Sequence, residues 1–152
     1  MTIIKNQHLW LDNVISYRTR IELNKLSQLI DHIRMNVEVL NLNIIGDMVF
    51  SIAEIINDSD VTIIGVEFIV PVNESITSNS HFVFKPKFRL ENAVMLKYCG
   101  KISEICAVKR LLNEYALDHN MGVLTDVYYE LKQLDGDNTV LNAYMGLCGN
   151  SL

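Results

Sequence analysis

Acidic and tyrosine side chains interrupt several apolar stretches of this 152-residue chain. Glu67 stands inside the apolar run 61–72, and Tyr128 and Glu130 stand inside the strand-like run 124–134. Burying such polar groups costs free energy unless they are paired, so we expect them to face a cleft or a partner. If they converge, they form an acidic cleft with aromatic walls that can take a cation or a basic peptide segment. The alternative is that they line the wet face of a sheet.

Strand alternation and neighbouring residue types extend this candidate site. Tyr128 and Glu130 share one face of an extended strand, whereas Tyr129 lies on the other. Trp10 has apolar neighbours near the N-terminus, where a lone tryptophan is more often a packing anchor than an interface hot spot. The candidate ligand- or partner-binding residues are Glu67, Tyr128, Glu130, Tyr144 and Trp10.

No residue pattern indicates catalysis, a metal or a cofactor. The four histidines are dispersed, and no nucleophile elbow or glycine-rich phosphate loop is present. The three cysteines lack ligand spacing, which is typical of reduced thiols in a cytosol, and we expect small buried side chains. Cys99 is expected at the inward-facing end of a strand, with a reactive thiol as the alternative. We therefore expect no catalytic residue, no metal, no cofactor and no enzymatic activity.

The elements that position these side chains occur twice in the same order. Helix-period spacing is followed each time by two strand-like runs, and the polar clusters 57–60 and 135–138 indicate hairpin turns rather than calcium loops. Strands are also expected before each helix, with Lys85-Pro86-Lys87 interrupting the second. The expected helices are 22–42 and 101–119, and the expected strands are 14–21, 48–56, 61–72, 81–84, 88–99, 124–134 and 139–147.

This order predicts an α+β fold made of two βαββ repeats with pseudo-twofold symmetry. The repeats are expected at about 8–73 and 81–148 of a single domain, 1–152, with the polar loop 73–80 as the seam. They would form an antiparallel sheet with the two main helices on one face, and strand 61–72 would be central because nearly all its residues are apolar. The uncovered face would then be available for binding.

Composition excludes several classes of protein. Hydrophobic residues make up 49% of the chain, which excludes a disordered protein. With a net charge of −5 and scattered basic residues, we expect no nucleic-acid partner, since phosphate binding relies on clustered Lys and Arg. No apolar run reaches membrane-spanning length and no signal peptide is recognisable, so we expect a cytoplasmic protein without direct membrane insertion.

Several short motifs resemble the gyrase-inhibitory-protein-like (GyrI-like) effector-binding domain. They are Tyr98-Cys99-Gly100-Lys101-Ile102, the helix that follows, Met121-Gly122 and the strand Val127-Tyr128-Tyr129-Glu130. The resemblance implies a two-βαββ fold with a ligand cleft, and a pocket acid near Asp126, Tyr128 or Glu130. Asp126-Val127-Tyr128 is the nearest match to the family's acid-x-tyrosine pattern, so Asp126 joins the candidate residues.

The chain also resembles stand-alone Gram-positive members of this fold that accompany type VII secretion loci. That resemblance implies a non-enzymatic cytosolic adaptor or chaperone for a protein partner, such as a secreted toxin or a small helical protein. The alternative is a free-standing sensor or sequestering protein for a small cationic or amphipathic ligand. A cofactor-free hydrolase is the third hypothesis.

Overall fold

The computed structural model describes residues 2–148 and shows an α+β protein with two compact units. The α1 unit comprises Trp10–Phe88, and the α2 unit comprises, of the described residues, 2–9 and 89–148. Two long strands, β1 (Ile3–Glu22) and β4 (Val83–Lys101), each contribute residues to both units. No helix within 2–148 combines the length and the apolar character that crossing a membrane requires.

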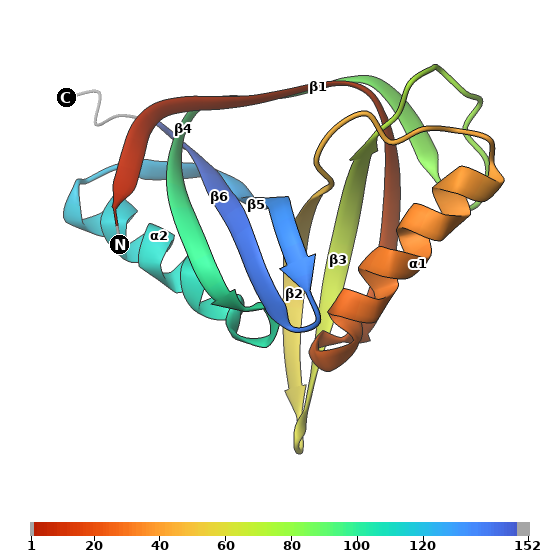
Figure 1. Ribbon diagram of the computed structural model, residues 1–152. Coiled ribbons are helices and arrows are strands. Elements are labelled where there is room, and N and C mark those ends of the chain that lie inside the picture. The colour runs from red at the N-terminus through yellow and green to blue at the C-terminus, as the bar shows by residue number, and fades with distance from the viewer. Residues whose placement is uncertain (1, 149–152) are drawn as a thin grey trace. The chain divides into compact units, whose positions relative to one another are not determined.

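The α1 unit contains an antiparallel sheet of three strands and one main helix (Figure 1). After β1, the short 3-10 helix η1 (Leu23–Lys25) leads into α1 (Leu26–Val39). The hairpin of β2 (Val49–Asp58) and β3 (Val61–Pro71) follows, and β3 lies between β1 and β2. The prediction of a central strand at 61–72 is thereby confirmed.

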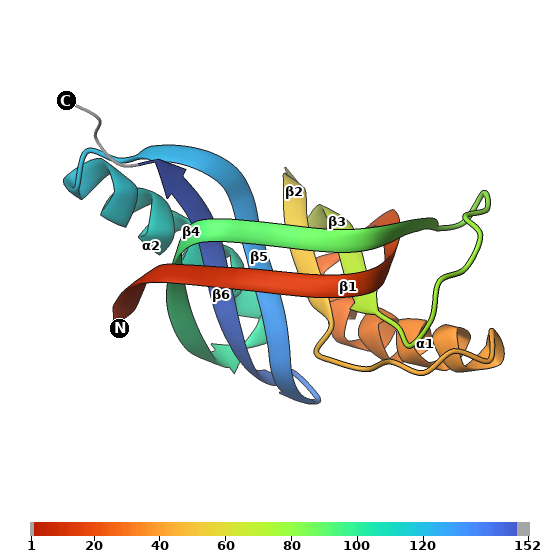
Figure 2. The same ribbon diagram turned by 90° about the horizontal axis from the view of Figure 1, so that it is seen from above.

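Helix α1 forms because its apolar residues recur at three- and four-residue spacing. Leu26, Ile30, Ile33 and Val37 are all buried, so this stripe faces the sheet beside which α1 lies in Figures 1 and 2. The helix ends at Val39, and Asn41 follows with a φ of 60°. Asparagine tolerates this left-handed conformation, which stops the helix.

The α2 unit has the same order of elements. The 3-10 helix η2 (Ile102–Glu104) and α2 (Cys106–Asp118) follow β4, and the hairpin of β5 (Gly122–Asp135) and β6 (Asn138–Cys148) comes next. Strand β6 lies between β4 and β5, all antiparallel. The expected element order is confirmed in both units, whereas pseudo-twofold symmetry and the common face for both helices stay predictions.

The turn and cap residues of the α2 unit behave largely as expected. Gly136 adopts a φ of +59° in the β5–β6 turn, and Asp137 accepts hydrogen bonds from the backbone nitrogen and hydroxyl of Ser103 at the start of η2. Asp137 therefore belongs to the hairpin turn and also accepts the bonds that hold the start of η2. His119 occupies the C-cap of α2, where its Nδ1 lies 2.9 Å from the Tyr115 carbonyl oxygen. His119 therefore caps the last turn of α2.

Three expectations about individual positions are wrong. Lys85-Pro86-Lys87 does not interrupt a strand, since β4 runs unbroken through Pro86. Cys99 is exposed because its neighbour Tyr98 takes the inward position and donates a hydrogen bond to the Lys101 carbonyl oxygen. Cys148 is also exposed and Cys106 is half-buried, so the cysteines are not buried core side chains.

Candidate binding site around Glu67

Strand pairing in the α1 unit sets Glu67 between two polar strand positions. Arg18 of β1 lies directly opposite Glu67, and Ser51 of β2 lies opposite it on the other side. Ser16 is two residues before Arg18 on β1 and therefore shares its face. The buried neighbours Val66 and Phe68 point to the other face of β3, so this stretch of the sheet has one apolar and one polar side.

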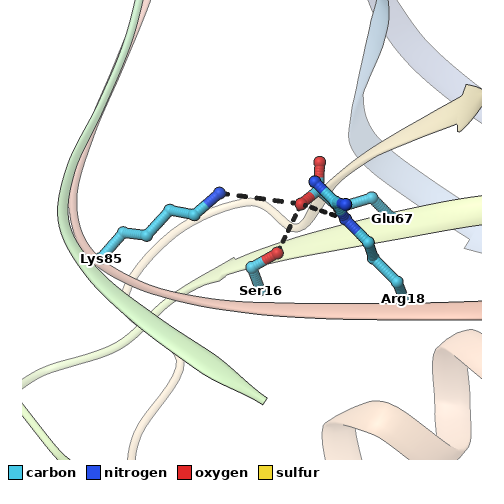
Figure 3. Close-up of polar contacts among 4 residues, drawn as sticks. All are labelled: Ser16, Arg18, Glu67 and Lys85. Carbon is cyan, nitrogen blue, oxygen red and sulfur yellow. Dashed lines mark hydrogen bonds and ion pairs between the residues drawn. The ribbon is translucent and has the colours of Figure 1, made fainter. Parts of the chain in front are cut away.

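The Glu67 carboxylate is nearly enclosed and accepts bonds from β1 (Figure 3). Its side chain is 14% exposed. The Ser16 hydroxyl donates to Oε2 at 2.6 Å, and Arg18 Nε donates to the same oxygen at 3.2 Å. Lys85 Nζ of β4 lies 3.8 Å from Oε2. One carboxylate is thus surrounded by a hydroxyl and two cations.

These neighbours decide the ionisation state of Glu67. Burial is the largest single influence and raises the pKa of Glu67. The hydrogen bonds from Ser16 and Arg18, together with the positive charges of Lys85 and Arg18, outweigh it and hold the pKa below its ordinary value of 4.5. Glu67 is therefore ionised at neutral pH.

A cavity of about 380 Å³ opens next to this carboxylate, within the α1 unit. Its walls come from β1, β3, the segment that precedes β4, and β4 itself. Ser16, Arg18 and Glu67 provide polar and charged groups from β1 and β3. Phe82 and Val83 provide apolar surface at the start of β4. The cavity is lined by Ser16, Arg18, Glu67, Asn79, Ser80, His81, Phe82, Val83 and Lys85.

A second, mainly apolar cavity of about 440 Å³ lies between α1, β1 and the same segment. It takes Ile15 and Tyr17 from β1, whereas the first cavity takes Ser16 and Arg18. Because successive side chains of a strand point to opposite faces, the two cavities lie on opposite sides of β1. The apolar cavity is lined by Ile15, Tyr17, Leu29, Ile33, Asn36, Val37, Val39, Leu40, Asn79, His81 and Phe82.

The segment Asn79–Phe82 borders both cavities and has its own internal bonds. Asn79 Oδ1 accepts hydrogen bonds from the backbone nitrogens of His81 at 2.8 Å and Phe82 at 3.0 Å. The Asn79 backbone nitrogen in turn donates to the Phe82 carbonyl oxygen. These bonds form a compact turn, which presents Phe82 to both cavities in a fixed position.

Replacing Asn79 with Ala should loosen this wall, because two backbone nitrogens lose their acceptor. The expected result is faster amide hydrogen exchange at His81 and Phe82, and a loss of global stability of about 1 kcal/mol. Asn79→Asp is the matched control, since a carboxylate oxygen still accepts both bonds. Equal exchange rates in Asn79→Ala and the native protein would contradict this role.

The α2 unit contains a second glutamate with its own network. Tyr144 donates its hydroxyl to Glu130 Oε1 at 3.2 Å, Asn142 Nδ2 donates to the same oxygen at 3.3 Å, and Lys132 Nζ lies 3.4 Å away. Burial, followed by the charge and hydrogen bond of Glu130, raises the pKa of Tyr144 to about 12. The Tyr144 phenol is therefore neutral at physiological pH, and the three partners of Glu130 all approach its Oε1.

The structure brings only some of the predicted site residues together. Glu130 and Tyr144 are hydrogen-bonded, and Tyr128 lies opposite Tyr144 in the β5–β6 ladder. The faces of β5 are as predicted, since Tyr129 is buried and Tyr128 and Glu130 are half-buried. Asp126 is exposed on the same strand, and no residue within 2–148 gives its carboxylate a hydrogen bond or ion pair.

Glu67 and Trp10 belong to the other unit. Trp10 is 54% exposed, because strand alternation buries Leu9 instead, so the expectation of a packing anchor is wrong. Trp10 also lies inside β1, which begins as early as Ile3. The expectation of an acidic cleft around Glu67 is wrong as well, since the two positive charges of Arg18 and Lys85 exceed the one negative charge of Glu67.

Sequence reasoning missed the partners of Glu67. Ser16 and Arg18 alternate with Ile15 and Tyr17 along the expected strand 14–21, but this alternation does not identify Glu67 as their partner. Lys85 lay in a supposed break between strands. The signal that could have found them is the antiparallel register of β1 with β3, which pairs Arg18 with Glu67.

Comparisons with known proteins give similarity of fold without similarity of sequence. No protein-family model matches the sequence, and no curated protein matches it significantly. Similar solved structures include EcmrR in a complex with DNA, with a TM-score of 0.65 and 14% identity over 95% of this chain and 57% of that one. The chain therefore spans little more than half of EcmrR in that complex.

Two further structures extend the comparison. The isolated EcmrR C-terminal domain gives a TM-score of 0.61 and 14% identity, covering 95% of this chain and 98% of the domain. A hydrolase from Listeria innocua gives a TM-score of 0.51 and 8% identity, covering 95% of this chain and 92% of that one. At these identities the likeness concerns the fold alone. It supports the GyrI-like fold that the sequence resemblance implies, and it has no bearing on type VII secretion.

Proposed function

We propose that this is a non-enzymatic binding protein that holds a small amphipathic molecule in the apolar cavity of the α1 unit. The observation that carries the proposal is the cavity itself. Its volume of about 440 Å³ falls in the range of small-molecule sites, and apolar side chains with a few polar groups, among them Asn79 and His81, form its wall. Such a wall suits an apolar body with one polar end.

The composition of the wall also indicates how the ligand is held. Ile33 and Val37 are buried on α1 and form the floor, whereas Val39 is 80% exposed at the end of the helix. Covering exposed apolar surface with an apolar ligand removes it from water, at about 25 cal/mol for each Å². The Asn79–Phe82 turn provides polar groups at the edge for the ligand's polar end.

The neutral fluorophore N-phenyl-1-naphthylamine tests the proposal, because its emission rises in apolar surroundings. We expect the native protein to bind it, and we expect Leu29→Trp to weaken binding at least tenfold because Leu29 is a half-buried wall residue of the cavity. Leu111→Trp is the matched control, since Leu111 is an exposed leucine of α2 that lines neither cavity. No emission change with native protein, or equal weakening by both variants, would refute the proposal.

A protein partner is the second candidate, in the role of a cytosolic adaptor or chaperone. The observation that favours it is the exposed apolar pair Met35 and Val39, one turn apart on α1. Co-purification from the native host should then recover a stoichiometric protein with the native chain and much less with Val39→Asp. Recovery that is equal for both would count against this role. A type VII secretion substrate is one such partner, as the sequence resemblance implies.

A further inference from the structure

The charged cavity beside Glu67 presents bonding groups that no residue within 2–148 occupies. Ser16, Arg18 and Lys85 all approach Oε2 of the carboxylate. Figure 3 shows the other oxygen, Oε1, without a bond, and no residue within 2–148 donates to it. A half-used carboxylate next to a cavity is a ready acceptor for a donor on a ligand.

The two cations of the cavity are also only partly used. Arg18 donates through Nε to Glu67, and no other hydrogen bond from its guanidinium occurs within 2–148, so its terminal amino groups are available. The side chain of Arg18 is 77% exposed, which leaves those groups accessible to a ligand. Lys85 Nζ lies 3.8 Å from the carboxylate, too far to commit its donors.

These groups discriminate between ligand charges. Glu67 carries one negative charge, and Arg18 and Lys85 carry two positive ones. A simple cation that approaches Oε1 would meet both cations, and a simple anion that approaches them would meet the carboxylate. A zwitterion with its opposite charges close together avoids both conflicts, since each of its charges faces an opposite charge.

We propose that the cavity binds the zwitterionic head of an α-amino acid. The ammonium group donates to Glu67 Oε1, and the carboxylate accepts from the terminal amino groups of Arg18 and from Lys85, in the bidentate manner that arginine favours. Phe82 and Val83 in the wall then face the amino-acid side chain. The volume of about 380 Å³ is sufficient for a molecule of this size. This site lies on the opposite side of β1 from the apolar cavity and is independent of the proposed function.

Calorimetric titration of the full chain with each of the common L-amino acids in turn measures their binding affinities and so tests the proposal. We expect at least one amino acid to bind, and we expect both its methyl ester and its N-acetyl derivative to bind at least tenfold more weakly. The ester removes the negative charge and the acetyl group removes the positive one. If no amino acid binds, or if the ester or the acetyl derivative binds as tightly as the parent, the proposal is overturned.

Two variants locate the binding in this cavity. Arg18→Gln should weaken amino-acid binding at least tenfold, because the carboxylate loses its bidentate partner. Arg20→Gln is the matched control, since Arg20 is on the same strand but pairs with Glu54 and lines neither cavity. Equal weakening by both variants would overturn the assignment of the site. Binding of N-phenyl-1-naphthylamine should persist in Arg18→Gln, so failure of the apolar site and failure of the charged site are distinguishable.

Discussion

Replacing Phe68 with Ala is expected to lower the free energy of unfolding by about 3–5 kcal/mol, the usual cost of removing a buried phenylalanine. Phe68 is fully buried on β3, the central strand of the α1 unit. Its ring lies 6.0 Å, centroid to centroid, from that of Phe50, which is opposite it on β2. The substitution therefore leaves a cavity that backbone hydrogen bonds on both sides of β3 keep from collapsing.

Urea unfolding followed by circular dichroism measures this loss. Phe82→Ala is the matched control, since Phe82 is a half-buried phenylalanine of the same unit at the wall of the two cavities. We expect it to cost about 1 kcal/mol, because a side chain that is partly exposed loses less burial. Equal losses for the two variants would show that Phe68 does not form the core of the unit.

The residues of β3 also illustrate what the sequence could predict. The apolar run 61–72 marked a central strand, and the structure places β3 between β1 and β2. Hydrophobic periodicity likewise predicted α1 and α2 and the two hairpins, because the burial of a helix stripe or a strand face is a local property of the sequence. The element order therefore followed from patterns within about twenty residues.

The partners of Glu67 could not be predicted in this way. The contacts of Glu67 with Ser16, Arg18 and Lys85 span up to 51 residues of sequence and depend on strand register. A shift of one residue in the pairing of β1 with β3 would remove Arg18 from the position opposite Glu67. Pattern analysis identified a costly acid within an apolar strand, but it could not show that the acid was neutralised by two cations.

The same limitation explains the error at Lys85-Pro86-Lys87. Proline lacks the backbone donor of a strand, so this tripeptide indicated a break. The strand β4 nevertheless continues through it, and Lys85 extends towards Glu67. Local propensity describes the cost of a proline in a strand, but it does not determine where the strand ends.

Replacing Glu67 with Gln is expected to lower stability at pH 7 by about 1.5 kcal/mol, the low end of the range for hydrogen bonds to charged groups. The low end applies because Arg18 is largely exposed and regains water when the charge is lost. The neutral amide still accepts from Ser16, but it no longer attracts Arg18 and Lys85. Denaturant unfolding at pH 7 measures the loss.

The pH dependence gives the sharper result. Because the pKa of Glu67 is lowered in the folded protein, the unfolded chain binds this proton more readily, and stability rises with pH between the two pKa values. The contribution of Glu67 is complete above its ordinary pKa of 4.5 and is lost as the pH falls through the lowered value. Between pH 6 and pH 3 the stability of the native protein should therefore decline more steeply than that of Glu67→Gln, so the two stabilities converge in acid.

A surface acid of the same sheet is the control for this convergence. Glu54 pairs with Arg20 and is 38% exposed, and exposed ion pairs of this kind contribute about 0–1 kcal/mol. Glu54→Gln should therefore change stability at pH 7 much less than Glu67→Gln does. If Glu67→Gln keeps the same difference from the native protein across the whole pH range, the carboxylate is not stabilised by Ser16, Arg18 and Lys85. In that case the charge balance on which an amino-acid site depends would also be lost.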